Sequence, residues 1–208
     1  PLAVVYCIDQ SDSMGRSSKF QIALTAAAES AAMLAPEARV GVITFSDLPR
    51  WAVPITEAEH ADAIRERLGE LSVHGGTSIY PALQLAYDAL AEEEAKLKHV
   101  ILLTDGRSVT TLKTSGQVVD NMARRKMTVS AVAIGRESDQ EELQQVASLG
   151  EGRFYYTEDF ATIPQILLDE TMTVVRTNKI DQRIAVHAVD DSRFLDGIDV
   201  ESIPDLQG

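Results

Sequence analysis

The sequence LAVVYCIDQSDSMG, residues 2–15, passes from an apolar run directly into a polar segment with two acids and two serines. The apolar, β-branched run over residues 2–8 is typical of a buried β-strand. Asp9, Ser11 and Ser13 then occupy every second position. In extended backbone, side chains two residues apart point to the same side. We therefore expect three oxygen donors to leave the end of this strand together, which indicates a binding site.

The segments beyond this strand alternate between strand and helix patterns. Strands are predicted at 39–45, 99–105, 128–135 and 152–157, and helices at 18–34, 58–70, 79–95, 113–126, 138–149 and 160–176. The first strands are nearly continuous in hydrophobicity, which favours a mostly parallel sheet covered by helices on both faces. Residues 50–56 follow a short connection and contain Pro54, so we expect an antiparallel edge strand there. The predicted fold class is α/β, a doubly wound, mostly parallel, six-stranded sheet with one antiparallel edge strand.

Composition and charge argue against several classes of function. The 208 residues carry a formal net charge of −13, with 32 acids against 19 bases, and no basic patch that would follow a nucleic-acid backbone. Cys7 is the single cysteine and falls inside the first strand, so no disulfide can form within one chain. No apolar run approaches the roughly 20 residues that span a bilayer. We expect a soluble fragment that contacts neither nucleic acid nor a membrane.

The predicted domain covers residues 1–176. Residues 177–208 contain one short strand pattern, at 184–189, followed by acids and turn residues. We interpret this extension as a linker towards a following domain that lies outside the sequence, and a strand or strap packed on this domain is the open alternative. The abrupt start at Pro1, with no charged leader or cleavage site, likewise indicates an excised piece of a longer protein.

Two further stretches place oxygen donors at the same edge of the predicted sheet. Thr77 follows the Gly75-Gly76 pair just before a helix, and the glycines permit a close backbone approach. Asp105 ends the strand at 99–105. Ligands of doubly wound sheets bind outside the carboxyl ends of the strands. The residues predicted to converge on one point are Asp9, Ser11, Ser13, Thr77 and Asp105.

All five predicted site residues offer oxygen, with no thiolate and no imidazole among them. This donor set selects a hard cation, Mg²⁺ first and Mn²⁺ or Ca²⁺ as alternatives, and suits zinc poorly. We expect the three hydroxyls to bind the metal directly and the two carboxylates to hold it through water. The metal would then keep most of its positive charge and an open position for an anion.

Other kinds of site fit these residues less well. An EF-hand loop would need glycine and glutamate where Met14 and Phe20 stand. The sequence lacks both a phosphate-binding glycine motif and the strand-end lysine of a receiver-type phosphoryl site. A cryptic serine hydrolase stays open as an alternative, with Ser13 as nucleophile, His74 as base and Asp105 orienting it, although no G-x-S-x-G turn surrounds the serine. A metal site that serves only the structure is the other alternative.

The sequence resembles the von Willebrand factor type A (VWA) domain family over residues 2–176. The family's metal-ion-dependent adhesion site, written DxSxS…T…D, matches Asp9, Ser11, Ser13, Thr77 and Asp105 one for one. The resemblance implies a doubly wound fold, Mg²⁺ coordination by the serines and threonine, and contacts through water from the aspartates. It also implies a non-enzymatic interaction module in which an Asp or Glu of a partner protein completes the metal's ligands.

A narrower resemblance points to a bacterial parent protein. The stretches DQSDSM (9–14), GGTSIYPALQLAYDAL (75–90) and GRFYYTEDFATIPQILLDET (152–171) are similar to bacterial membrane-anchored proteins that join this domain to a glutamine amidotransferase-like domain. The resemblance implies that the parent chain is membrane-associated and continues past residue 208 into the second domain.

Two residues near the motif are candidate modulators of the site. Asp12 departs from the family pattern, which commonly has glycine between the two serines. Its carboxylate would tighten cation binding, favour Ca²⁺ or Mn²⁺, or repel a partner's acid. His74, beside the glycine pair, is the second candidate. Because the chain is strongly acidic, we expect the partner's carboxylate to come from a locally neutral or basic surface.

Overall fold

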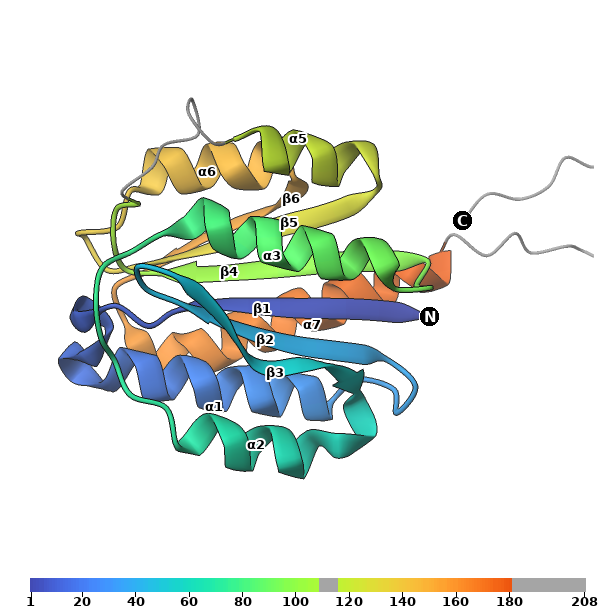
Figure 1. The fold of residues 1–208 in the computed structure, drawn as a ribbon, viewed down its shortest axis with the longest axis horizontal. Coiled ribbons are helices and arrows are strands. Elements are labelled where there is room, and N and C mark those ends of the chain that lie inside the picture. Colours follow the sequence, from blue (N-terminus) through green and yellow to red (C-terminus); the bar gives the residue numbers. More distant parts are fainter. Residues whose placement is uncertain (109–115, 181–208) are drawn as a thin grey trace, which may run out of the picture.

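The centre of the molecule is a six-stranded sheet with the strand order β3-β2-β1-β4-β5-β6 (Figure 1). The computed structural model describes residues 1–108 and 116–180. The strands are β1 (Leu2–Asp9), β2 (Arg39–Phe45), β3 (Pro49–Glu57), β4 (Leu97–Thr104), β5 (Met127–Ile134) and β6 (Glu151–Thr157). Only β3 pairs antiparallel, with β2, and the remaining pairs of this sheet are parallel. The predicted fold class is confirmed, including the antiparallel edge strand.

Helices cover both faces of the sheet, as the continuous hydrophobicity of the strands predicts. One face carries α1 (Lys19–Ala32), α2 (Ala61–Gly69) and α7 (Ile163–Ile180), and the other carries α3 (Ile79–Glu92), α5 (Gln117–Arg124) and α6 (Gln140–Leu149) (Figure 1). Side chains alternate along β1 because successive residues of a strand point to opposite faces. Val4 and Tyr6 join the core under α1 and α7, whereas Val5 and Cys7 join the core under α3. Cys7 is therefore a buried core residue.

Short 3₁₀ segments account for the differences at the starts of the helices predicted at 58–70 and 160–176. The 3₁₀ segments in the described residues are η1 (Asp12–Ser18), η2 (Ala58–His60) and η3 (Phe160–Thr162). The helix predicted at 160–176 begins with η3, and α7 then continues to Ile180. The first residues of the helix predicted at 113–126 and the strand pattern at 184–189 lie outside the described residues, so the division at residue 176 stays a prediction.

The register of the central strands decides where the candidate site forms. β1 and β4 are neighbours and run parallel, with Ile8 opposite Leu103. Asp9 therefore stands opposite Thr104, and Asp105 follows at once. The carboxyl ends of both strands lie at the same edge of the sheet, where α1 and α3 also begin (Figure 1).

Candidate metal site

Two buried carboxylates lie at the carboxyl ends of β1 and β4. Asp9 is fully buried and Asp105 is 2% exposed. Thr104 Oγ1 donates a hydrogen bond to Asp9 Oδ2, and it accepts one from the backbone N–H of Gly106 at 3.1 Å. These bonds fix the Asp9 carboxylate beside the loop that carries Asp105.

The two serines reach the site through a turn, which corrects the expectation of extended backbone. The chain is extended only as far as Ser11, whose N–H donates to Asp9 Oδ1 at 2.8 Å. Ser13 lies in η1, where the N–H of Met14 bonds the carbonyl of Ser11 at 3.0 Å. The hydroxyl oxygens of Ser11 and Ser13 still lie 3.0 Å apart, and Ser13 Oγ donates to Asp105 Oδ1 at 2.6 Å. The two serines are therefore close together because the chain turns, and not because of the two-residue period of a strand.

Thr77 enters the site from the loop before α3. Gly75 has φ +76°, a left-handed conformation that favours glycine, and the N–H of Gly76 donates to Asp47 Oδ1 at 3.1 Å. Thr77 is 7% exposed, and its Oγ1 would lie 2.8 Å from a β-carbon placed on Gly106. The Thr77 hydroxyl thus packs against the residue that follows Asp105. The loop approaches so closely because position 106 carries no side chain.

The electrostatics of these residues fit a bound cation. Burial, and to a smaller extent the nearby negative charge of Asp105, raises the pKa of Asp9 to about 6, although hydrogen bonds from Thr104 and Ser11 lower it. A cation at this point would offset the cost of burying both carboxylates. Across residues 1–108 and 116–180, no three His, Cys, Asp or Glu side chains gather to hold a metal. The donors available at this edge are two carboxylates and three hydroxyls, a set that suits an oxygen-preferring divalent ion.

The structure places the two candidate modulators at the rim. His74 is exposed, and its Nδ1 lies 3.1 Å from Ser46 Oγ. Ser13 donates its hydroxyl hydrogen to Asp105 itself, so the described contacts do not form a Ser13–His74–Asp105 relay. Asp12 is exposed, and its φ is not left-handed, so its conformation does not require glycine. Its N–H bonds the carbonyl of Gly75 at 3.2 Å, which ties the two loops together.

Sequence patterns missed three residues that contact the site. Lys19, the first residue of α1, places its ammonium nitrogen 2.6 Å from Asp105 Oδ2. The Thr104 hydroxyl donates a hydrogen bond to Asp9, and the Asp47 carboxylate accepts one from the backbone N–H of Gly76 in the glycine loop. Thr104 directly precedes Asp105 in the sequence, and this adjacency is the one local feature that could have predicted its contact with the site. The contacts of Lys19 and Asp47 depend on the tertiary fold.

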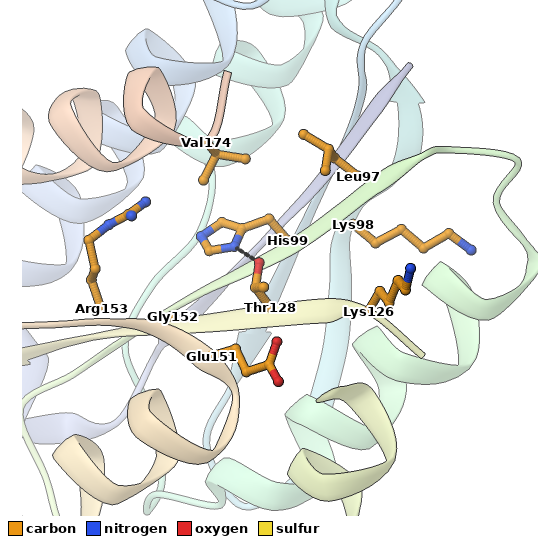
Figure 2. A pocket seen from close by; sticks show the side chains of 9 residues that line it. All are labelled: Leu97, Lys98, His99, Lys126, Thr128, Glu151, Gly152, Arg153 and Val174. Carbon is orange, nitrogen blue, oxygen red and sulfur yellow. Dashed lines mark hydrogen bonds between the residues drawn. The ribbon is translucent and has the colours of Figure 1, made fainter. Parts of the chain in front are cut away.

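Of two cavities lined by described residues, one adjoins the candidate metal site and the other does not. A groove of about 260 Å³ beside Lys19 is lined by charged residues that include Arg16, Arg136 and Glu158, together with Phe160. A separate cavity of about 130 Å³ lies at the amino ends of β4, β5 and β6, where His99, Thr128 and Arg153 line it (Figure 2). The second cavity is at the opposite edge of the sheet from Asp105.

The fold and these residues define a doubly wound α/β domain whose parallel strands end in a cluster of carboxylates and hydroxyls. The chain belongs to the von Willebrand factor type A domain family, whose sequence profile matches residues 3–169. Domains of this family are often metal-dependent adhesion or protein-interaction modules and are generally not enzymes. Among the described residues, no helix combines the length and apolar character that a membrane span requires.

Individual relatives agree with the family assignment. The collagen alpha-1(XXI) chain of Xenopus laevis is 28% identical over 160 residues, which is 75% of this chain and 16% of the collagen. The solved von Willebrand factor type A protein of Catenulispora acidiphila has a TM-score of 0.74 at 24% identity, covering 83% of this chain and 42% of that one. Proximal thread matrix protein 1 of the mussel byssus has a TM-score of 0.71 at 20% identity, covering 84% and 48%. This chain therefore spans less than half the length of each of these three relatives.

The mussel structure bears on the choice of metal. It is described with zinc occupying its metal-ion-dependent adhesion site motif, abbreviated MIDAS. Zinc can therefore occupy the site that bears this name in that protein.

Proposed function

We propose that this chain is a metal-dependent protein-interaction module that binds an acidic side chain of a partner. The hydroxyls of Ser11, Ser13 and Thr77 would hold the cation directly, and Asp9 and Asp105 would hold it through water. Mg²⁺ is the first candidate, because it prefers oxygen ligands and usually keeps several waters. The observation that carries the proposal is the continuous contact from Asp9 through Ser11 and Ser13 to Asp105.

A carboxylate is the partner group that such a site favours. Neutral hydroxyls leave the charge of a divalent cation largely uncompensated, so the bound ion attracts an anion. Charge-assisted contacts are also stronger than neutral hydrogen bonds. The Asp or Glu of a partner protein would replace a water on the metal. Since this chain carries a net charge of −13, we expect that residue to lie on a neutral or basic surface.

The partner mode can be tested with small molecules. Mn²⁺ bound to the EDTA-treated domain reports its coordinated water through the relaxation of water protons. We expect acetate to lower this relaxation in a saturable way, because its carboxylate replaces water, and we expect isosteric acetamide to have little effect. A protein-free Mn²⁺ solution gives the baseline for acetate. Equal effects of acetate and acetamide, or none from acetate, would refute carboxylate binding.

The same samples separate the alternatives. If cations raise the melting temperature but acetate leaves the relaxation unchanged, the site serves only the structure. Ester turnover that Ser13→Ala abolishes would support the hydrolase. The described geometry does not favour that alternative, since Ser13 bonds Asp105 and His74 bonds Ser46.

We expect Asp12 to have a small effect on the affinity of the site, strengthening the binding of the cation and weakening the binding of a carboxylate. Asp12→Asn removes an exposed negative charge beside the site, so cation affinity should fall by no more than about fivefold while acetate binds slightly better. Glu37→Gln, an exposed acid outside the candidate site, is the matched control. Calorimetry of both variants measures the cation effect. If Asp12→Asn behaves like the control, Asp12 is only a turn residue.

The wider context of the domain is also a proposal. The resemblance to bacterial membrane-anchored proteins with a glutamine amidotransferase-like domain supports a membrane-associated parent chain. In such a parent, the domain would dock a partner protein through the metal.

A further inference from the structure

Lys19 is the basic residue that directly contacts the candidate metal site. Its ammonium nitrogen lies 2.6 Å from Asp105 Oδ2, and the two side chains are only 12% and 2% exposed. The pair is therefore far less screened by water than an ion pair on the surface. The neighbouring Arg16 is unlike it, since its side chain is 73% exposed and pairs with Glu137 at 3.8 Å.

One further contact, with Phe160, and the fixed orientation of Asp105 hold the ammonium in place. The Lys19 nitrogen lies 5.0 Å from the centroid of the Phe160 ring, within the range of a cation–π interaction. The two carboxylate oxygens of Asp105 have different partners, since Oδ1 accepts a hydrogen bond from Ser13 and Oδ2 accepts one from Lys19. The carboxylate cannot turn away from Lys19 without losing the bond from Ser13. The positive charge is thus a fixed part of the site.

This fixed charge changes the electrostatic balance of the site. Two carboxylates and one ammonium leave the cluster with one net negative charge. A bound divalent cation then gives the cluster a net charge of +1. Without the lysine, the two carboxylates and the cation would have a net charge of zero. Lys19 also repels the cation directly.

We infer that Lys19 is a specificity-determining residue. It weakens the binding of the cation and strengthens the binding of a carboxylate to the cation-loaded site. This inference rests on the proposed function. It assigns Lys19 the task of keeping the loaded site electropositive in a chain that is otherwise acidic. The ligand class it favours is a carboxylate over a neutral oxygen donor.

The test uses two variants that remove the charge. Lys19→Gln keeps a hydrogen-bond donor for Asp105 and should fold, and Lys19→Met removes the donor as well. Calorimetry with Mg²⁺ and Mn²⁺ should show cation affinity increased by on the order of tenfold in both variants. Acetate, followed by water-proton relaxation on the Mn²⁺-loaded domain, should bind several-fold more weakly. Opposite changes for cation and carboxylate are a result that a merely structural role of Lys19 would not give.

Two controls isolate the position of the charge. Lys96→Met removes an exposed lysine at the far end of β4 and should leave both affinities within twofold of wild type. Lys19→Arg keeps the charge and should restore values close to wild type.

The outcomes separate this inference from the proposed function. Unchanged or weaker cation binding in Lys19→Gln, with a wild type that binds the cation, overturns the role of Lys19 alone. Changes of cation and acetate affinity in the same direction overturn it too. A wild type and variants that all fail to bind any divalent cation overturn the proposed function together with this inference.

Discussion

Glu170→Ala is expected to lower the free energy of unfolding by about 3 kcal/mol or more. Glu170 lies on α7 and is fully buried against the sheet. Its carboxylate accepts hydrogen bonds from Ser130 Oγ at 2.6 Å, Tyr155 Oη at 2.6 Å and Arg153 Nε at 2.7 Å. Alanine would leave these donors without their acceptor and would open a cavity between α7 and strands β5 and β6.

The charge of Glu170 is part of this effect. Burial alone would raise the pKa of Glu170, but contacts from His99, Arg153, Ser130 and Tyr155 together hold it well below its ordinary value. A lowered pKa contributes stability above the pKa of the unfolded chain, and this contribution is lost as the pH falls towards the folded value. The variant should therefore be less stable than wild type at neutral pH, with a smaller difference in strong acid.

Urea unfolding at neutral pH measures this difference. Asp169→Ala is the matched control, because Asp169 is the exposed neighbour of Glu170 on the same helix. We expect the control to stay within about 0.5 kcal/mol of wild type. Similar losses in the two variants would show that the buried carboxylate has no special role in fixing α7.

Two residues that contact Glu170, His99 and Arg153, also line the cavity at the amino ends of the strands (Figure 2). His99 Nδ1 lies 2.6 Å from Thr128 Oγ1, the contact drawn in the figure. Its Nε2 lies 3.0 Å from Glu170 Oε1 but outside hydrogen-bonding geometry. His99 and Arg153 thus belong to the network that attaches α7 to the sheet.

Asp105→Ala is expected to weaken cation binding by about 10- to 100-fold, which lowers or abolishes the saturation seen by calorimetry. Asp105 carries half of the carboxylate charge of the site and orients Ser13 through the 2.6 Å hydrogen bond. The variant also leaves the Lys19 ammonium unpaired at the site, which adds repulsion to the lost attraction. Both effects act in the same direction.

Two comparisons make this result specific. Ser13→Ala removes a proposed direct ligand and should show a similar loss without changing the charge. Asp88→Ala removes an exposed carboxylate on α3 and should bind cations as wild type does. Circular dichroism confirms that each variant is folded. Cation binding by Asp105→Ala at wild-type strength would exclude Asp105 from the site.

The fold could be predicted because each strand carries its own signal. Continuous apolar runs such as residues 2–8 reveal a strand buried on both faces, and Pro54 reveals an edge. The order of strands and helices along the chain is then compatible with only a few sheet topologies. The placement of Asp9 and Asp105 at strand ends follows from the same pattern, since parallel strands end at one edge.

Other features depend on contacts between distant residues, which local patterns do not record. Lys19 and Asp105 are 86 residues apart, and Ser130 and Glu170 are 40 apart. Nothing in the spacing of these residues marks them as partners. The position of Ser13 was predicted from an extended chain, yet it depends on the 3₁₀ turn of η1. The helices predicted at 58–70 and 160–176 begin in the structure with short 3₁₀ segments, η2 and η3, because 3₁₀ turns resemble helix in sequence.

Titration of the EDTA-treated wild-type domain with Mg²⁺ by isothermal calorimetry tests the metal site most directly, with Mn²⁺, Ca²⁺ and Zn²⁺ in parallel. We predict saturable binding with one ion per chain for Mg²⁺ or another of these cations. The absence of saturable binding for all four cations would contradict a metal-dependent function for this domain.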